Sequence, residues 1–194
     1  MARRRRRRVM ALGVSAGLAL AVAVAAAMIV VTDRGHHAAP ARDPPLTLQP
    51  NGTIEQVIDG DTVVARVDGR DEHVRLIGID TPETVDPKRP VMCFGPEASA
   101  ETHQLLPLGT PVRLVRDIEA RDAYGRLLAY VYRATDGTFV NLALAQGGFA
   151  DVLAIAPNTA HGDELRAAVT DAKQAHRGLW GSCRSFGQPV GSSP

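Results

Sequence analysis

Four carboxylates are concentrated in two short stretches of this sequence. The first stretch, IDGDTV, contains Asp59 and Asp61, and the second, DTPE, contains Asp80 and Glu83. Taken alone, each stretch is also an ordinary turn, because Asp-Gly and Thr-Pro both favour turns. If the two turns converge, however, their oxygens form the hard ligand set that Ca²⁺ or Mg²⁺ prefers. The pattern therefore indicates a metal site at Asp61 and Asp80.

Two arginines accompany these carboxylates. Arg75 stands within the apolar run VRLIGI, and Arg126 follows the turn-like sequence DAYG. A half-buried arginine needs an anion, and its planar guanidinium matches two oxygens of a phosphate group. Glu83 is then left as a carboxylate that can orient or deprotonate a water molecule. A metal, two arginines and one glutamate are the groups that phosphodiester hydrolysis requires, because charge developing on phosphate oxygens must meet fixed cations.

Short strands must position these residues. Residues 52–58, 62–67 and 72–79 have strand-like patterns and are separated by the turn sequences DGD and DGRD. The runs TPVRLVRDI and RLLAYVYRA add two more segments with alternating apolar residues. Five short strands within about 85 residues predict a small β-barrel, in which neighbouring strand ends bring distant turns together.

Three helices are interleaved with the strands. Residues 97–106 follow a proline, carry Glu in the first turn and stop before Pro107. Residues 139–148, FVNLALAQGG, predict a short helix that ends at two glycines. The pattern of residues 163–177 places four side chains on one helix face: Leu165, Val169, Ala172 and His176.

The charge balance constrains how a polyanion would be held. The chain has a net charge of +1, but six of its 22 basic residues form the run Arg3 to Arg8. From Thr47 onward there are 14 Lys and Arg against 19 Asp and Glu, a net charge of −5. A nucleic-acid binder that relies on a broad basic face has the opposite sign. A phosphate ligand must therefore be held locally, by a few arginines and a metal.

The N-terminus predicts export. The basic run is followed by 23 uncharged residues, Val9 to Val31, which as a helix span ~34 Å, enough to cross a bilayer. We expect residues 1–31 to be a signal peptide or membrane anchor, followed by a Pro-rich linker at 32–50. Cleavage near Ala39-Pro40-Ala41 is the alternative to an anchor. Either outcome places the rest of the chain outside the cytoplasm, membrane-anchored or secreted.

The two cysteines fit an oxidising compartment. Cys93 and Cys183 are the only cysteines of the chain. A disulfide between them would close a loop of about 90 residues, worth roughly 4–5 kcal/mol in the chain-entropy model. The alternative is two unrelated buried thiols. We expect the bridge, which would tie the end of the loop that follows DTPE to a C-terminal tail at 183–194.

Five motifs together resemble one known family. The pattern of the staphylococcal nuclease (thermonuclease) family is matched, in order and spacing, by IDGDTV, RLIGIDTPET, FGPEAS, DAYGRLLAYVY and VNLALAQGGFA. The resemblance extends from about Thr47 to Trp180. It implies an α+β fold over residues 51–182, a five-stranded OB-fold barrel with three packed helices. It also implies a calcium-dependent endonuclease that hydrolyses DNA and RNA, breaking the 5′ P–O bond and leaving 3′-phosphate ends.

The resemblance implies a role for each acidic residue of the two motifs. Asp61 and Asp80 match carboxylate ligands of Ca²⁺, and Thr81 matches a ligand that uses its backbone carbonyl. Asp59 matches a nearby acid that supports these ligands without binding the metal. Glu83 matches the residue that orients or activates the attacking water.

The remaining matches concern phosphate, and two departures concern the rest of the substrate. Arg75 and Arg126 match the pair that grips the phosphate and stabilises the transition state, and Tyr124 matches a residue that contacts a neighbouring phosphate. Ala123 stands where the best-known member has a lysine. The segment FADVLAIAPN lacks the tyrosines that line the nucleotide pocket in that member. Base stacking adds ~1–3 kcal/mol per base, so these departures affect substrate affinity rather than chemistry.

A binding module and a surface scaffold are the two alternatives to a nuclease. A non-catalytic nucleic-acid-binding module of the same fold would be expected to lose an Asp ligand, the Glu or an Arg, and all are present here. A tethered surface protein whose barrel is only a scaffold leaves the five polar matches unexplained. No segment of the sequence has the pattern of an oligomer interface, so we expect a monomer.

Overall fold

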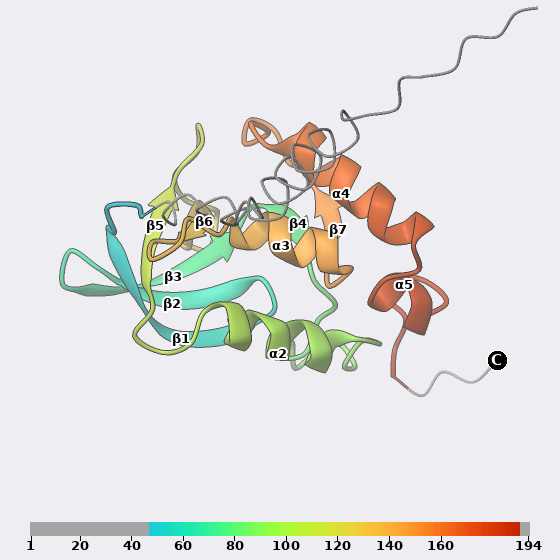
Figure 1. Cartoon of the computed structure of the whole chain (residues 1–194). Coiled ribbons are helices and arrows are strands. Elements are labelled where there is room, and N and C mark those ends of the chain that lie inside the picture. Colours follow the sequence, from blue (N-terminus) through green and yellow to red (C-terminus); the bar gives the residue numbers. More distant parts are fainter. Residues whose placement is uncertain (1–46, 191–194) are drawn as a thin grey trace, which may run out of the picture. The chain divides into compact units, whose positions relative to one another are not determined.

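Alternating apolar residues close five strands into a barrel (Figure 1). The computed structural model describes residues 47–190, and in them the strand order around the barrel is β1–β2–β3–β6–β5. These strands are β1 (Gly52–Asp59), β2 (Thr62–Val67), β3 (Arg70–Leu76), β5 (Pro111–Val115) and β6 (Leu127–Arg133). The predicted five-stranded barrel is thus confirmed.

One parallel pairing closes the barrel. β3 pairs with β6 in parallel, whereas the other neighbouring strands of the barrel are antiparallel. Because side chains alternate along a strand, β3 buries Val74 and Leu76 completely on one face and places Arg75 on the other face, where it remains mostly buried. Arg126 immediately precedes β6. The parallel pairing therefore brings the two predicted arginines to neighbouring strands.

The predicted strand 72–79 is divided in the structure. β3 ends at Leu76, and β4 (Gly78–Asp80) pairs instead with β7 (Asp151–Leu153). Gly78 has a φ of 84°, in the left-handed region that favours glycine, and a Cβ there would collide with the Leu165 side chain. The expectation of one continuous strand is therefore wrong, because this bend redirects the chain before Asp80.

Three helices cover the barrel near the predicted positions (Figure 1). α2 (Gly95–Leu105) lies against β1, and α3 (Val140–Gly147) packs against both β6 and α4 (Gly162–Gln174). α3 is followed by Gly148, whose φ is 76°, as the two glycines predicted. The helices join the barrel core through fully buried apolar side chains, among them Leu144, Leu165 and Val169.

The end of α4 differs from the sequence prediction. The helix stops at Gln174, and His176 is exposed with a φ of 51°. Its predicted place on one helix face with Leu165, Val169 and Ala172 is therefore wrong. The chain turns here because the Leu179 N–H donates to the Gly148 carbonyl oxygen at 2.9 Å, which fixes the one-turn helix α5 (Leu179–Ser182) beside the end of α3.

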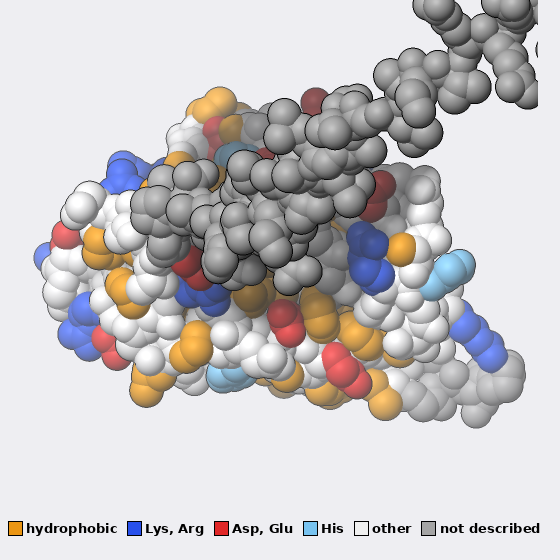
Figure 2. All heavy atoms as spheres, in the orientation of Figure 1, with side chains coloured by type: hydrophobic (Ala, Val, Ile, Leu, Met, Phe, Trp, Pro, Cys, Tyr) orange, Lys and Arg blue, Asp and Glu red, His pale blue; other side chains and the backbone are white. Residues whose placement is uncertain are grey.

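The predicted export segment, residues 1–31, lies outside the described residues, as do positions 32–46 of the predicted linker. Within the described range, 47–190, no helix is both long and apolar enough to span a membrane. On the face drawn in Figure 2, basic and acidic side chains are interspersed over the coloured surface. That face therefore carries no broad basic area, in keeping with the negative charge of this part of the chain.

Candidate active site

The predicted site residues meet around one hollow of about 440 Å³ beside β3. Its walls come from the β1–β2 turn, β3, the loop after β4 and the residue before β6. The lining includes every residue predicted as a metal ligand or catalytic group, namely Asp61, Arg75, Asp80, Thr81, Glu83 and Arg126, together with Asp59. We call it the polar hollow.

Arg75 connects the two predicted carboxylate ligands. Its Nη1 lies 3.0 Å from Asp61 Oδ2, and its Nη2 lies 2.9 Å from Asp80 Oδ1. Nη1 also donates to the carbonyl oxygen of Leu76 at 2.7 Å. Only 13% of the Arg75 side chain and 10% of the Asp61 side chain are exposed. Charges as deeply buried as Arg75 and Asp61 depend on partners rather than on water, whereas Asp80, with 39% of its side chain exposed, also meets solvent.

The donors around Asp61 and Asp80 fit a hard divalent cation. Burial raises the pKa of Asp80, and the charge of Asp61 adds to the increase despite Arg75. A cation near both carboxylates would relieve this repulsion. Within residues 47–190 no three His, Cys, Asp or Glu side chains are grouped as a metal site. A cation here would therefore need a non-carboxylate oxygen as well, such as the backbone carbonyl of Thr81.

Thr81 lies at the centre of this donor set. Its N–H donates to Asp61 Oδ2 at 2.9 Å, which joins the loop after β4 to the β1–β2 turn. Its hydroxyl is buried, and in the described structure it has no hydrogen-bond partner. A Cβ on Gly60 would lie 2.6 Å from this hydroxyl, so the glycine is required for the close approach. An unpartnered buried oxygen beside two carboxylates is consistent with a cation site.

Glu83 is fixed by the turn that follows it. Its Oε1 accepts hydrogen bonds of 2.9 to 3.1 Å from three successive backbone N–H groups, those of Thr84, Val85 and Asp86. Its Oε2 lies 3.3 Å from Arg89 Nη2. Burial by itself would raise the pKa of Glu83, but the hydrogen bonds outweigh it and hold the pKa below its usual value. The carboxylate is therefore ionised at neutral pH and can accept a hydrogen bond from water.

Asp59 anchors the start of the same loop. Its Oδ1 accepts hydrogen bonds from the Thr84 hydroxyl at 2.6 Å and from the Gly60 N–H at 2.8 Å. Burial raises the pKa of Asp59 to about 6, although the Thr84 hydrogen bond opposes the increase. Asp59 therefore supports the backbone next to Glu83. The family resemblance implied a supporting acid at this position.

Arg126 is oriented by a residue that the sequence analysis did not single out. Its Nε donates to Asp122 Oδ2 at 2.7 Å, and its backbone N–H donates to Asp122 Oδ1 at 2.9 Å. The guanidinium carbon lies 5.6 Å from the ring centroid of Tyr124. Tyr124 itself is 87% exposed and lies outside the lining of the polar hollow. The four-residue spacing of Asp122 and Arg126 was the only sequence signal for this pair.

A second hollow of about 410 Å³ shares Arg75 and Arg126 with the first. Tyr124 lies on its wall together with mostly apolar side chains, including Leu76, Ile79, Leu128, Leu153 and Ile155. We call it the apolar hollow. Leu153 ends β7 and Ile155 follows it, so this wall is formed by the segment that lacks tyrosines.

Thr84 and Arg89 are two further residues that the sequence analysis missed. Thr84 bonds to Asp59, and Arg89 pairs with both Glu83 and Asp86. Both lie in the loop after DTPE, which has no strand or helix pattern. Only their hydrogen-bonding side chains in this loop could have drawn attention to them.

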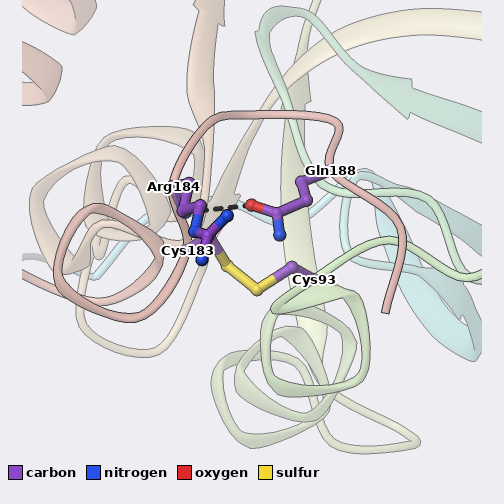
Figure 3. The surroundings of a disulfide bond; sticks show 4 residues. All are labelled: Cys93, Cys183, Arg184 and Gln188. Carbon is purple, nitrogen blue, oxygen red and sulfur yellow. Dashed lines mark hydrogen bonds between the residues drawn. A yellow bond between two sulfur atoms is a disulfide. The ribbon is translucent and has the colours of Figure 1, made fainter. Parts of the chain in front are cut away.

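The predicted disulfide is present in the structure (Figure 3). Cys93 and Cys183 are bonded, with their Cα atoms 6.1 Å apart and 90 positions apart in the sequence. Cys93 lies two residues before α2, and Cys183 directly follows α5. The bridge therefore joins the loop that begins at Glu83 to the segment after the last helix.

Comparisons with known proteins show which family the chain resembles. The family model described as "Staphylococcal nuclease homologue" matches residues 73–182. A thermonuclease of Staphylococcus intermedius is 41% identical over 127 residues, which is 66% of this chain and 74% of that protein. A thermonuclease of Staphylococcus hyicus is 38% identical over 66% of this chain and 73% of its own length. Endonuclease YncB of Bacillus subtilis is 37% identical over 67% of this chain and 61% of its own length.

Proposed function

The chain belongs to the staphylococcal nuclease family, and from this premise we propose that it is a calcium-dependent nuclease acting on both DNA and RNA. It is a phosphodiesterase of the endonuclease type, as its relatives are. One observation carries the proposal: Arg75 bridges Asp61 and Asp80 in the same hollow that Glu83 and Arg126 line. Four segments converge there, which a scaffold without chemistry would not require.

The metal of the family is a divalent cation, and we propose Ca²⁺. Asp61, Asp80 and the backbone carbonyl of Thr81 would hold it. When bound, it supplies positive charge beside the phosphate. Ca²⁺ accepts varied arrangements of oxygen ligands, including a backbone carbonyl, whereas Mg²⁺ demands a near-ideal octahedron, which favours Ca²⁺ for this donor set.

The chain's own residues account for the other parts of the reaction. Glu83, ionised and held by three N–H donors, accepts a hydrogen bond from water and orients it toward phosphorus. The guanidinium groups of Arg75 and Arg126 face the shared edge of the two hollows and donate to phosphate oxygens as negative charge develops. The oxygen of the water forms the new bond to phosphorus as the water gives up a proton, and the bond to the 5′ oxygen breaks. The 5′ oxygen takes up a proton and leaves as a hydroxyl, and a 3′-phosphate remains.

The contacts of Arg75 and Arg126 with phosphate would allow the protein to accept both DNA and RNA. Phosphate is common to DNA and RNA, and both arginines recognise phosphate rather than sugar or base. The apolar hollow offers a surface for a neighbouring base through Leu153, Ile155 and Tyr124. Apolar contact with a base is tolerant of sequence, which supports a sugar-nonspecific nuclease.

We further propose that the protein works outside the cytoplasm as a monomer, anchored in the membrane or secreted after cleavage of its N-terminal segment. The disulfide between Cys93 and Cys183 supports an oxidising compartment. Fractionation of cells, followed by N-terminal sequencing of the recovered protein, separates the anchored form from the cleaved form. Recovery in the cytoplasm would contradict this proposal.

A cleavage assay tests the proposed reaction. Plasmid DNA and a structured RNA are incubated with the protein in Ca²⁺, in Mg²⁺ and in a chelator, and the product ends are identified. We expect cleavage of both polymers that needs Ca²⁺ and leaves 3′-phosphates. Cleavage in Mg²⁺ alone, or 5′-phosphate ends, would contradict the proposal. Tight binding of nucleic acid without cleavage would favour the non-catalytic module.

A further inference from the structure

The C-terminal segment is attached to the loop between β4 and α2, close to the start of α2. We call residues 81–94 of this loop the catalytic loop and residues 183–190 the strap. The Cys93–Cys183 disulfide joins them covalently (Figure 3). The Cys93 N–H also donates to the Gln188 carbonyl oxygen at 2.7 Å, and the Val190 N–H donates to the Val91 carbonyl oxygen at 2.9 Å. The strap thus adds two backbone hydrogen bonds, in an antiparallel arrangement, to one covalent bond.

These attachments lie next to the backbone of Glu83. The N–H of Met92, between the two strapped residues, donates to the Glu83 carbonyl oxygen at 2.9 Å. A Cβ on Gly95, at the start of α2, would lie 3.0 Å from the same oxygen. The backbone of Glu83 is therefore packed between the start of α2 and residues 91–93, which bond to the strap. A shift of residues 91–93 would move Glu83 with them.

The rest of the catalytic loop offers little other support. In the described structure, the hydrogen bonds of residues 85–90 stay within the loop, to Glu83 and Asp86. Val85 and Val91 are 55% and 40% exposed. The loop is thus held at its beginning by Asp59 and by the bond between Thr81 and Asp61, and at its end by the strap and α2. Loosening one of these two supports should change the place of Glu83.

The fold does not depend on the bridge in the same way. α5 is held independently, because Leu179 is 1% exposed and its N–H bonds to the Gly148 carbonyl oxygen. Cys93 and Cys183 are only half-buried and lie outside the apolar core cluster. Reduction of the bridge would remove the covalent link and leave the strap attached to the catalytic loop only by non-covalent contacts, while the barrel and helices keep their packing.

We propose that the Cys93–Cys183 bridge is a positioning device for Glu83, which makes hydrolysis depend on an oxidising environment. This inference rests on the proposed nuclease function. Two-electron reduction by a dithiol breaks the S–S bond, leaves two protein thiols and converts the dithiol to its own disulfide. A misplacement of a catalytic group by about 1 Å can cost roughly 100-fold in rate. The chain would therefore be nearly inactive in a reducing compartment although it is folded.

The first test compares oxidised and dithiothreitol-reduced wild-type protein in Ca²⁺. We expect reduction to lower kcat by at least ~10-fold, with KM changed by less than about twofold, because Glu83 and not substrate contact is disturbed. Circular dichroism at the assay temperature must show the reduced protein folded. An unchanged kcat in folded, reduced protein would overturn the inference. Absence of cleavage by the oxidised protein would instead count against the proposed function.

A variant cycle distinguishes positioning from general stabilisation. In Glu83→Gln the group through which the bridge acts is already impaired, so reduction should have almost no further effect on the residual rate. If the bridge only stabilises the fold, reduction will lower the rates of wild type and Glu83→Gln by the same factor. That second result would overturn the inference.

A matched pair of variants tests the strap with the disulfide intact. Val190→Pro removes the N–H that bonds to Val91, whereas Val190→Ala keeps it. We expect a lower kcat for the proline variant only; equal rates would overturn the role of this hydrogen bond.

Hydrogen exchange of the Thr84, Val85 and Asp86 amides provides a readout that needs no cleavage. Reduction should accelerate exchange at these amides while those of β2 stay protected. Unchanged exchange at the three amides would overturn the positioning role, whatever the enzymatic activity.

Discussion

The two hollows that share Arg75 and Arg126 are lined by side chains of different chemical character. The polar hollow is lined by carboxylates whose oxygens are held by fixed donors; Glu83 alone accepts three backbone N–H bonds. The apolar hollow is lined largely by aliphatic side chains, and three residues of its wall are substantially exposed: Tyr124 at 87%, Ile155 at 64% and Leu153 at 40%. One region is therefore fixed in place, and the other is open and adaptable.

The difference separates chemistry from substrate contact. Groups that act in the transition state are most effective when they are fixed before the substrate arrives, since charge already in place needs no reorganisation during the reaction. A surface that contacts a base can be loose, because apolar contact requires no exact direction. Changes in the polar hollow should therefore lower kcat, and changes in the apolar hollow should alter KM.

The largest effect is expected at the shared edge. Arg126→Ala should lower kcat by at least ~100-fold, because a preorganised donor to the phosphate is lost. Arg126→Lys keeps the charge without the planar fork and should recover only part of the rate. Steady-state kinetics on a labelled oligonucleotide measure both, with the exposed Arg166→Ala on α4 as the control. Near-normal turnover of Arg126→Ala would remove this residue from the reaction.

A smaller effect is expected for metal affinity. Loss of a residue that only orients a metal ligand already costs roughly 10–100-fold in metal affinity. Asp80→Asn removes one of the two proposed carboxylate ligands and should therefore weaken Ca²⁺ binding by at least ~10-fold. Isothermal titration calorimetry with Ca²⁺ measures the change. Asp163→Asn, a fully exposed carboxylate on α4, should leave the affinity as it is. Equal affinity for wild type and Asp80→Asn would place the metal elsewhere.

A substitution in the apolar hollow should increase affinity for the nucleic-acid substrate. Ile155→Tyr adds an aromatic face on its wall and should lower KM several-fold, since base stacking is worth ~1–3 kcal/mol, while kcat stays within about twofold. Leu108→Tyr adds the same group at a site 76% exposed and outside the lining of both hollows, and should change neither constant. A fall in kcat for Ile155→Tyr would break the proposed separation.

The smallest effect lies outside both hollows. Arg133 pairs with Asp136 at 2.6 Å and holds the pKa of Asp136 well below its ordinary value of 3.8. The pair therefore stabilises the fold above about pH 4, and this contribution is lost as the pH falls through the lower folded-state pKa.

Asp136→Asn should cost about 1 kcal/mol at pH 7, a value reduced for the partial exposure of the pair. Urea unfolding at pH 7 and pH 3 measures the cost, which should shrink at the lower pH, while cleavage is unaffected. A constant cost at both pH values would contradict this reading of the pair.

The fold was largely predictable because its signals are local. The strand at 62–67 and the helix ended by Gly148 follow from alternation and from turn chemistry within a few residues. The polar hollow was predictable for a related reason: Asp61 and Asp80 stand at the ends of strands or runs, and a small barrel brings such ends together.

The remaining features depend on contacts between distant residues. The bend at Gly78 needs a glycine, because its φ is positive and Leu165 of α4 leaves no room for a side chain, and no window around Gly78 contains the contact with Leu165. The β4–β7 pair and the turn at His176 likewise follow from packing against distant segments. Thr84 and Asp122 were missed because their importance lies in what they hold, Asp59 and Arg126 respectively.

The carboxylate of Glu83, held by three backbone N–H groups, is proposed to take part in hydrolysis. The most direct measurement is the turnover of Glu83→Gln on a labelled oligonucleotide at saturating substrate and Ca²⁺, with Ca²⁺ affinity measured in parallel. We predict a fall of at least ~100-fold in kcat with Ca²⁺ affinity unchanged, because the amide can neither accept a proton nor orient water as the carboxylate does. Turnover close to that of the wild type would contradict the account.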